Sequence, residues 1–397
     1  MRKTAGRARA WLVGGVAAAL VSGAFVVGVA GPASADPTTT FVGVGSDTIQ
    51  DVMNQLASTV GGGLVGSYDA VDPVTAAAGG QIAPKSGCTM TRPNGSGQGL
   101  NALRASINPN TTAGQLADKP EAGCVDFARS SSGPAAADKS VNGALVYVPF
   151  ALDAVAPATG PATAVTGSDP AVATNITHAD QFTLTDLQTL YANCAPITEG
   201  GVTYTPNGTT TDATHQPIHL YVPQAGSGTR NFWLQTLGIS TTGSLPPCVN
   251  DHVTINGQSV QVEEHDGTVF ANDADALGPF SIAQWVAQKN GHHERRHNAV
   301  LHSLNGTAAL TSAGALNTAY PITREVYNIV SFSRVTSTAS ADAAFRSIFN
   351  GPSSAICRGA STLINFGFAL LNTAPLGHTC GQVANDLRAF DPASDPV

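Results

Sequence analysis

Apolar runs and segments of helical periodicity alternate along this chain and predict its architecture. The apolar runs predict strands at residues 41–45, 125–129, 144–151, 219–223 and 325–332. Apolar positions at helical spacing predict helices at residues 49–59, 183–191, 339–350 and 361–371. Residues 61–87 are rich in Gly, Ala and Pro and predict a loop. This alternation is typical of an α/β fold.

Residues 1–35 have a different pattern, which is typical of a cleaved export signal. Four basic residues precede an apolar run at 11–30, and Ala33-Ser34-Ala35 fits a cleavage site before Asp36. The alternative is a retained membrane anchor. No cysteine stands at the cleavage point, so there is no lipobox for lipid attachment. We expect a secreted or envelope-associated protein without membrane insertion after cleavage.

Length and composition leave room for two domains with a sizeable core. The chain has 397 residues, of which 42% are hydrophobic and only 12% are charged. Its formal net charge of −8 makes nucleic acid and anionic membranes poor partners. Local N–H donors can still bind an anion. We expect a monomer that needs no cofactor.

Six cysteines in an exported chain predict disulfide bonds. Their spacing favours three local pairs, although six cysteines allow 15 pairings. The expected pairs are Cys88–Cys124, Cys194–Cys248 and Cys357–Cys380. No CxxC pair is present to indicate zinc or thioredoxin-type chemistry.

Three short Gly/Ser/Thr segments, at residues 43–48, 94–99 and 225–230, carry the candidate chemistry. Each precedes residues that can start a helix. Glycine lets the backbone approach a ligand closely, Ser and Thr supply hydroxyl donors, and a helix start offers free N–H groups. A single such loop is usually only a helix cap. Three of them, two near the N-terminus and one past the middle, predict two lobes that close on a small oxyanion.

The order of these segments resembles the phosphate-binding, substrate-capturing proteins of ABC transporters, a type 2 periplasmic-binding-protein-like family. The resemblance runs from about residue 41 to residue 371. It rests on the loops at 45–48, 95–99 and 127–131, the Ser-Gly-Thr element at 227–229, the helix at 183–191 and the strand at 321–330.

The resemblance implies two α/β lobes joined by crossing strands at 146–154 and 324–333. The first lobe would comprise residues 36–148 and 326–397, and the second lobe residues 149–325. Phosphate or a related oxyanion would bind between the lobes, and an ABC permease would be the partner.

The same resemblance implies a set of ligand-binding residues. They are Gly45, Ser46, Thr48, Ser96, Gly97, Arg129, Ser130, Ser131, Ser227, Gly228, Thr229 and Arg230. Two positions depart from the family. Ser131 stands where the family has an Asp that accepts the proton of phosphate and repels sulfate, so that discrimination is weakened. Pro223 stands where the family has an Arg, and Arg129 or Arg230 is expected to supply the missing cation.

One motif points to different chemistry. His293-Glu294-Arg295-Arg296-His297 matches the HExxH pattern of zinc peptidases, which needs both His side chains on one face of a helix. The adjacent arginines and the preceding Gly291 favour an exposed loop instead. No serine-hydrolase elbow or Walker A motif is present. Three hypotheses therefore stand: an oxyanion receptor of an ABC importer, a secreted scavenger uncoupled from transport, and a zinc peptidase. We expect a binding protein and not an enzyme.

Overall fold

The computed structural model describes residues 39–73, 78–108, 122–371 and 377–393, and the predicted signal segment lies outside them. The strands are β1 (Phe41–Gly45), β2 (Val65–Ser67), β3 (Gln81–Ile82), β4 (Met90–Thr91), β5 (Phe127–Ser130), β6 (Leu145–Thr159), β7 (Ile197–Glu199), β8 (Val202–Pro206), β9 (His215–Tyr221), β10 (Val249–Asn250), β11 (His252–Ile255), β12 (Gln258–Gln261), β13 (Ala276–Ser281), β14 (Val300–Leu301), β15 (Thr323–Ser331) and β16 (Arg388–Ala389). The α-helices are α1 (Gln50–Thr59), α2 (Ser96–Ile107), α3 (Leu184–Asn193), α4 (Gly228–Thr236), α5 (Thr268–Asn272), α6 (Ile282–Lys289), α7 (Phe332–Thr336), α8 (Ala343–Phe349), α9 (Ala355–Arg358) and α10 (Ala360–Asn365).

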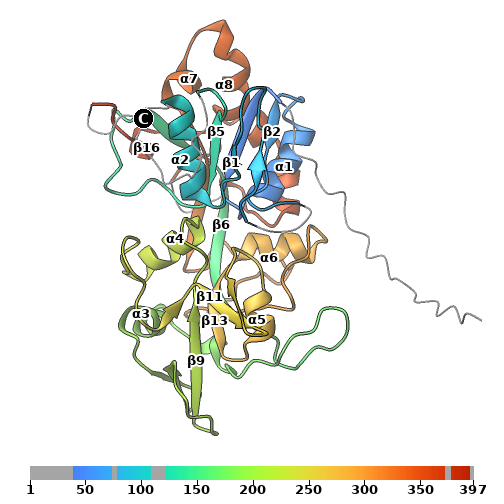
Figure 1. Ribbon diagram of the computed structural model, residues 1–397, viewed down its shortest axis with the longest axis vertical. Coiled ribbons are helices and arrows are strands. Elements are labelled where there is room, and N and C mark those ends of the chain that lie inside the picture. The colour runs from blue at the N-terminus through green and yellow to red at the C-terminus, as the bar shows by residue number, and fades with distance from the viewer. Residues whose placement is uncertain (1–38, 74–77, 109–121, 372–376, 394–397) are drawn as a thin grey trace, which may run out of the picture. The chain divides into compact units, whose positions relative to one another are not determined.

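The fold is a mixed α/β arrangement of two lobes on one path of paired strands (Figure 1). The path runs β2-β1-β5-β15-β6-β13-β9-β8-β7. We call β1, β2 and β5 with α1, α2 and α7 to α10 the first lobe, and α3 to α6 with β7 to β13 the second lobe. The long antiparallel strands β6 and β15 pair with each other and connect the two lobes. The exact lobe boundaries stay a prediction.

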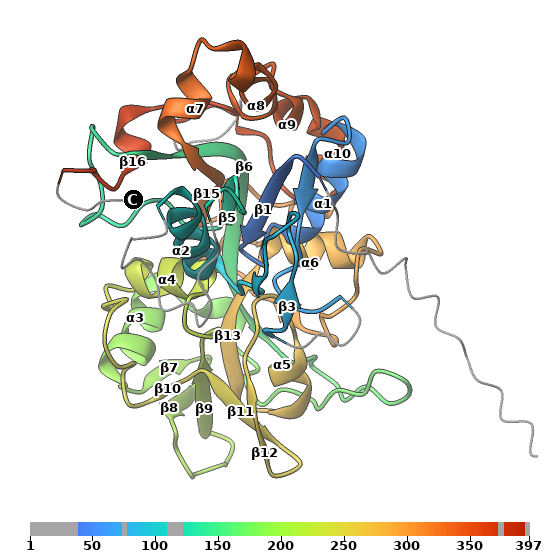
Figure 2. The same cartoon turned by 45° about the horizontal axis from the view of Figure 1, so that its top comes forward.

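The direction of the strands brings several candidate loops to the carboxyl ends of the parallel strands. In the first lobe β1 is parallel to β5, and in the second lobe β9 is parallel to β13. Ligands of open α/β sheets bind outside the carboxyl ends of such strands. The segment at 45–48 follows β1, residue 131 follows β5, and the segment at 225–230 follows β9. Figure 2 shows α2 of the first lobe facing α4 of the second.

Several predicted elements are confirmed. β1 has the predicted bounds, and all 15 residues of β6 are buried, which explains the uninterrupted apolar run at its start. Thr183 caps α3 through a capping box with Asp186. Trp233 is fully buried and meets Tyr191 edge to face, at a centroid distance of 5.7 Å. The core therefore contains the side chains that the apolar pattern selects.

Two local predictions are wrong in part. Residues 61–87 are not all loop, because β2 pairs in parallel with β1 and β3 pairs with β4. These strands are too short to show alternation, and residues 74–77 lie outside the described part. The helix expected at 361–371 is shorter, since α10 ends at Asn365 and Gly367 adopts a φ of 79° that only glycine accepts readily.

The three expected disulfides are confirmed. They join Cys88 to Cys124, Cys194 to Cys248 and Cys357 to Cys380. The first and third bonds lie among first-lobe elements, and the second lies in the second lobe. In the described ranges, every helix is too short or too polar to cross a bilayer.

Candidate functional site

Hydroxyl and N–H donors from both lobes converge on one buried carboxylate, that of Glu264. Thr48 of the first lobe donates to Glu264 Oε2 from its Oγ1, at 2.7 Å, and from its backbone N–H, at 3.2 Å. On the second lobe, the Ser227 hydroxyl and the Thr229 N–H, at 3.2 Å, donate to Oε1. All four residues are at most 2% exposed. We call these donors of Thr48, Ser227 and Thr229 the nest. The nest suits an anion because every group in it donates a hydrogen bond.

Local sequence explains why the donors point inward. Ser227 is the N-cap of α4 and accepts the Arg230 N–H at 2.9 Å, so its proton is left for the carboxylate. Gly45, which precedes the first donor segment, adopts a φ of 115°, and a Cβ there would lie 2.8 Å from the Arg129 carbonyl oxygen. Only glycine fits that close approach. The glycines and the cap are therefore structural requirements of the nest.

A chain of hydrogen bonds connects a buried cation to this carboxylate. Arg324 Nη2 donates to Thr229 Oγ1 at 3.0 Å, and Thr229 Oγ1 lies 3.1 Å from Thr48 Oγ1. Since an arginine only donates and Thr48 donates onward to Glu264, each hydroxyl accepts on one side and donates on the other. Such a chain is polarised from cation to anion and strengthens its members.

Arg324 lies on β15 and forms a buried ion pair with Asp153 of β6. Its Nε and Nη2 lie 3.0 and 2.8 Å from Asp153 Oδ2, and both side chains are at most 2% exposed. Ser281 and the Ala283 N–H also donate to Asp153. Arg324 Nη1 is buried and has no hydrogen-bond partner among the described residues. The cation beside the nest therefore comes from the connecting strands.

The two arginines expected at the ligand have other partners. Arg129 is fully buried and donates to the carbonyls of Gly43, Gly45 and Ser46, so it holds the first donor segment in place. Burial lowers its pKa to about 10, against the opposing effect of nearby carboxylates. Arg230 pairs with Asp251 at 2.8 Å. Neither contact reaches the nest, whereas Arg324 is joined to it through Thr229.

The other predicted site residues lie around the nest with their polar groups mostly engaged. Ser96 Oγ accepts the Ser131 N–H at 3.1 Å. The Gly97 N–H donates across the lobes to the Gly226 carbonyl at 3.0 Å. Ser130 turns away, since its hydroxyl donates to the Ser132 carbonyl at 2.7 Å. The remaining two differ: Ser46 Oγ is buried without a hydrogen-bond partner in the described part of the chain, and Gly228 packs on Ser96 and Ser131.

Two carboxylates that face basic side chains flank the nest, and these contacts also join the lobes. Asp47 lies 2.6 Å from His265 Nε2, and Asp51 lies 3.1 Å from Arg295 Nη2. Burial acts to raise the pKa of Asp47, but His265 and the nearby arginines outweigh it and the pKa is lowered. Asp47 therefore faces its partner as a carboxylate.

Glu263, next to the nest, titrates near neutrality. Burial raises its pKa to about 7, and the charges of Asp47, Glu264 and Asp266 add to the effect. Asn94 opposes the shift by donating to Glu263 Oε2 at 3.1 Å. Because the folded protein binds this proton more tightly than the unfolded chain, stability falls as pH rises through about 7.

We expect Glu263→Gln to stabilise the protein at pH 8 and to do so much less at pH 5, where the folded wild-type side chain keeps its proton and only the unfolded chain has begun to release it. The midpoint of thermal unfolding should rise at pH 8 by roughly 2–4 °C for each kcal/mol gained. Calorimetric melting at both pH values checks this. Glu199→Gln, on β7 of the same lobe, is the matched control and should change neither midpoint. An equal midpoint for Glu263→Gln and wild type at pH 8 would contradict the prediction.

The HExxH segment is a turn and not a helix. α6 ends at Lys289, and His293 and His297 adopt φ values of 46° and 47°, outside the helical region. His297 lies 2.7 Å from Asp169, and Glu294 pairs with Arg296. As expected from its arginines, the segment lacks the shared helix face that zinc-peptidase chemistry requires.

One other group of side chains has the composition of a metal site. Among the described residues, His219, Asp273 and Asp275 offer ligand atoms within 4.8 Å of one another. These side chains already form hydrogen bonds with the protein, because His219 Nδ1 lies 2.8 Å from Asp273 Oδ2 and Asn175 donates to Asp275 at 2.8 Å. The cluster contains no residue of the nest, and we assign no metal to it.

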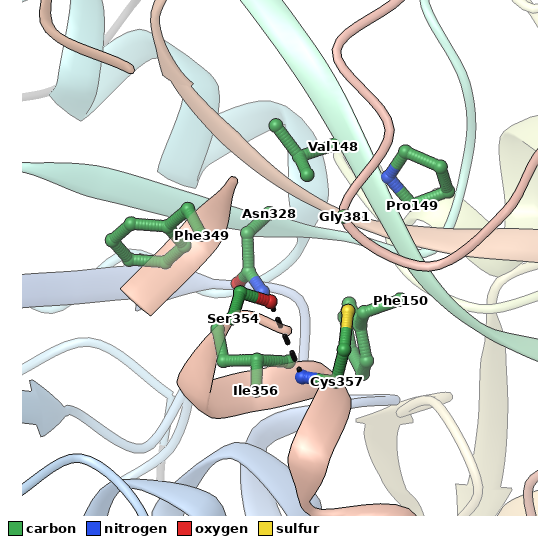
Figure 3. Close-up of a pocket in the computed structure, with 9 residues that line it drawn as sticks. All are labelled: Val148, Pro149, Phe150, Asn328, Phe349, Ser354, Ile356, Cys357 and Gly381. Atoms are coloured by element: carbon green, nitrogen blue, oxygen red, sulfur yellow. Dashed lines mark hydrogen bonds between the residues drawn. The ribbon is translucent and has the colours of Figure 1, made fainter. Parts of the chain in front are cut away.

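A small pocket lies between β6, β15 and α9 (Figure 3). Its lining is mostly apolar, and includes Val148, Phe150 and Phe349. The hydroxyl of Ser354 is turned to the Cys357 N–H, as a helix cap. No side chain of the nest lines this pocket, so it is a packing gap and not part of the candidate site.

Sequence reasoning missed two central residues, Glu264 and the cationic role of Arg324. The run from Glu263 to Asp266 was a usable signal, because four consecutive ionisable residues are conspicuous in a chain with 12% charged residues. Arg324 begins the predicted crossing strand, and a charge in a buried strand calls for a partner. His265 belongs to the same run, and its φ of 42° places it in the left-handed region, at a turn of the chain.

Comparison with known proteins gives a family and several structural neighbours. A family model described as a PBP superfamily domain matches residues 30–343. No curated protein matches in sequence.

Three solved structures are similar over most of the chain. A Clostridium perfringens protein, described as a candidate phosphate ABC transporter substrate-binding protein with bound phosphate, has 14% identity and a TM-score of 0.45, covering 83% of this chain and 98% of its own. An ABC-type phosphate transport receptor from Vibrio cholerae has 16% identity and a TM-score of 0.45, covering 83% and 99%. PstS from Borrelia burgdorferi has 15% identity and a TM-score of 0.38, covering 84% and 98%. Because the family model spans most of its 397 residues, this chain belongs to the PBP superfamily domain family.

Proposed function

We propose that this chain is an exported receptor that captures a small oxyanion, phosphate or a close relative, between its lobes and delivers it to an ABC permease. One observation carries the proposal: four donors from two lobes converge on the Glu264 carboxylate. A carboxylate and a phosphate present the same kind of acceptor oxygens, and donors placed for one suit the other. The structural neighbours described above are phosphate receptors by description, and for this chain the ligand class rests on the nest.

In this proposal, Thr48, Ser227 and Thr229 hold the ligand and Arg324 supplies the nearby positive charge. Ser46, whose buried hydroxyl has no described partner, is a further donor. The hydroxyls of the nest act as hydrogen-bond donors in this proposal, and the proposed role is binding without catalysis. Ser131 in place of an acidic residue predicts weak discrimination between phosphate and sulfate.

Calorimetric titration of purified protein with phosphate and, separately, with sulfate tests the proposal. Carried-over ligand is first removed by unfolding with the disulfides intact, dialysis and refolding. We expect saturable binding of one anion per chain. Binding of both anions supports the weak discrimination expected from Ser131, and binding of phosphate alone contradicts it. No heat with either anion overturns the oxyanion receptor.

A further inference from the structure

The nest is filled by a side chain of the protein itself. Glu264 reaches it from the loop after β12, and its two oxygens are divided between the lobes: Oε2 binds Thr48 and Oε1 binds Ser227 and Thr229. One carboxylate thus makes the interlobe contacts that a captured oxyanion would make.

The nest has no room for both anions. A Cβ built on Gly228 would overlap the hydroxyl oxygens of Ser96 and Ser131, so the loops of the two lobes are in direct contact there. The Gly97 N–H already donates to the Gly226 carbonyl across the same seam. Two negatively charged groups sharing these few donors would also repel each other strongly in a buried setting. An incoming oxyanion must therefore replace the carboxylate.

Neighbouring contacts hold the Glu264 loop in this position. His265 pairs with Asp47, and Gln288 of α6 donates to the His265 carbonyl at 2.9 Å. Gln284, also on α6, donates to the Thr48 carbonyl. The carboxylate is therefore held in the nest by its own loop and by the helix behind it.

We propose that Glu264 is an internal ligand of the nest, which a captured oxyanion must displace and which sets the affinity of the site. The inference rests on the proposed function. Its consequence is thermodynamic: the apparent affinity equals the intrinsic affinity multiplied by the fraction of molecules whose nest is vacated. A substitution that weakens the contacts of Glu264 with the nest should raise that fraction and tighten oxyanion binding. A substitution that weakens the contacts of an ordinary ligand-binding residue would instead loosen oxyanion binding.

Glu264→Gln is the direct test, because the amide NH2 cannot accept from the N–H donors that face it. We expect this variant to bind inorganic phosphate at least about tenfold more tightly than wild type in calorimetric titration, since bonds to a charged group are lost. Glu263→Gln is the matched control. At pH 8, above its pKa of about 7, it removes a charge from the adjacent residue, whose carboxylate bonds to Asn94 and not to the nest, and its gain in affinity should be clearly smaller.

Small-angle scattering gives a readout that does not need a ligand. In buffer without oxyanions, Glu264→Gln should have a larger radius of gyration than wild type, because a contact shared by the lobes is lost. Glu264→Asp, one methylene shorter, replaces the glutamine variant if that one folds poorly, and should shift both readouts in the same direction.

The outcomes separate this inference from the proposed function. Equal gains in the two glutamine variants, or equal or weaker binding by a folded Glu264→Gln, overturn the internal ligand while the receptor stands. If neither the wild type nor any variant binds phosphate or sulfate, the proposed oxyanion receptor is overturned. The proposal that Glu264 occupies the nest as an internal ligand is then tested by scattering alone. An unchanged radius of gyration overturns it.

Discussion

Replacing Arg324 by methionine is expected to destabilise the protein by about 3–5 kcal/mol, the usual effect of removing one partner of a buried ion pair. Asp153 is completely buried, and Ser281 and the Ala283 N–H are its remaining donors. Its charge would then lack a cation in a medium of low polarity. Urea unfolding followed by tryptophan fluorescence measures the change in the free energy of unfolding.

The double variant Arg324→Met with Asp153→Asn is the control, since it removes both charges and should recover part of the lost stability. Arg324→Lys separates the stabilising role from the binding role. The lysine ammonium can pair with Asp153. It lacks the planar guanidinium of arginine, which also directs a donor to Thr229. We expect Arg324→Lys to keep most of the wild-type stability and to lose part of the phosphate affinity. A loss below about 1 kcal/mol in Arg324→Met would contradict the importance of the pair.

Replacing Ser227 and Thr229 by alanine in the Glu264→Gln background is expected to lower phosphate affinity tens-fold or more, because each hydrogen bond to a charged group contributes about 1.5–3 kcal/mol. The same hydroxyls hold Glu264 in the nest, directly or through Thr48. In the wild-type background the substitutions weaken the internal anion together with the ligand, and part of the loss cancels. The full loss should appear when the two substitutions are made in Glu264→Gln, by calorimetric titration in both backgrounds.

Thr236→Ala with Ser240→Ala is the matched control for that pair. It also removes two hydroxyls in or after α4, and these bond to the Phe232 and Thr242 carbonyls, away from the nest. Its phosphate affinity should equal that of its parent. An unchanged dissociation constant for the Ser227 and Thr229 variant in the Glu264→Gln background would contradict the site assignment.

The sequence predicted what local chemistry determines. Gly45 was found because a close backbone approach demands glycine, and Ser227 because a helix start demands a cap, and both requirements are visible within a few residues. The helix at 183–191 was predicted from its apolar spacing, and Thr183 caps it in the structure. The α/β class followed from the alternation of apolar runs and helical periods. These features need no knowledge of the rest of the chain.

The remaining parts of the site depend on packing between distant segments. Thr48 and Glu264 are separated by 216 residues, and Arg324 and Thr229 by 95. No pattern of neighbouring residues encodes such meetings. Arg129 shows the limit of a motif: its place suggested a ligand contact, and in the structure its N–H groups make four hydrogen bonds, to three backbone carbonyls and to the Ser67 hydroxyl. A motif identifies which residues lie near a site, and the fold decides which of them face it.

The disulfides pair each cysteine with the next cysteine in the chain, across 36, 54 and 23 residues. In the proposed export, the chain crosses a membrane from its N-terminus and presents Cys88 and Cys124 before the other cysteines emerge. An oxidant that joins thiols in the order of their arrival therefore makes the native bonds at each stage. Maturation of the exported protein should depend on an oxidase and need little help from an isomerase. At each stage the earlier cysteines are already bonded, so the two free thiols that remain are the native pair.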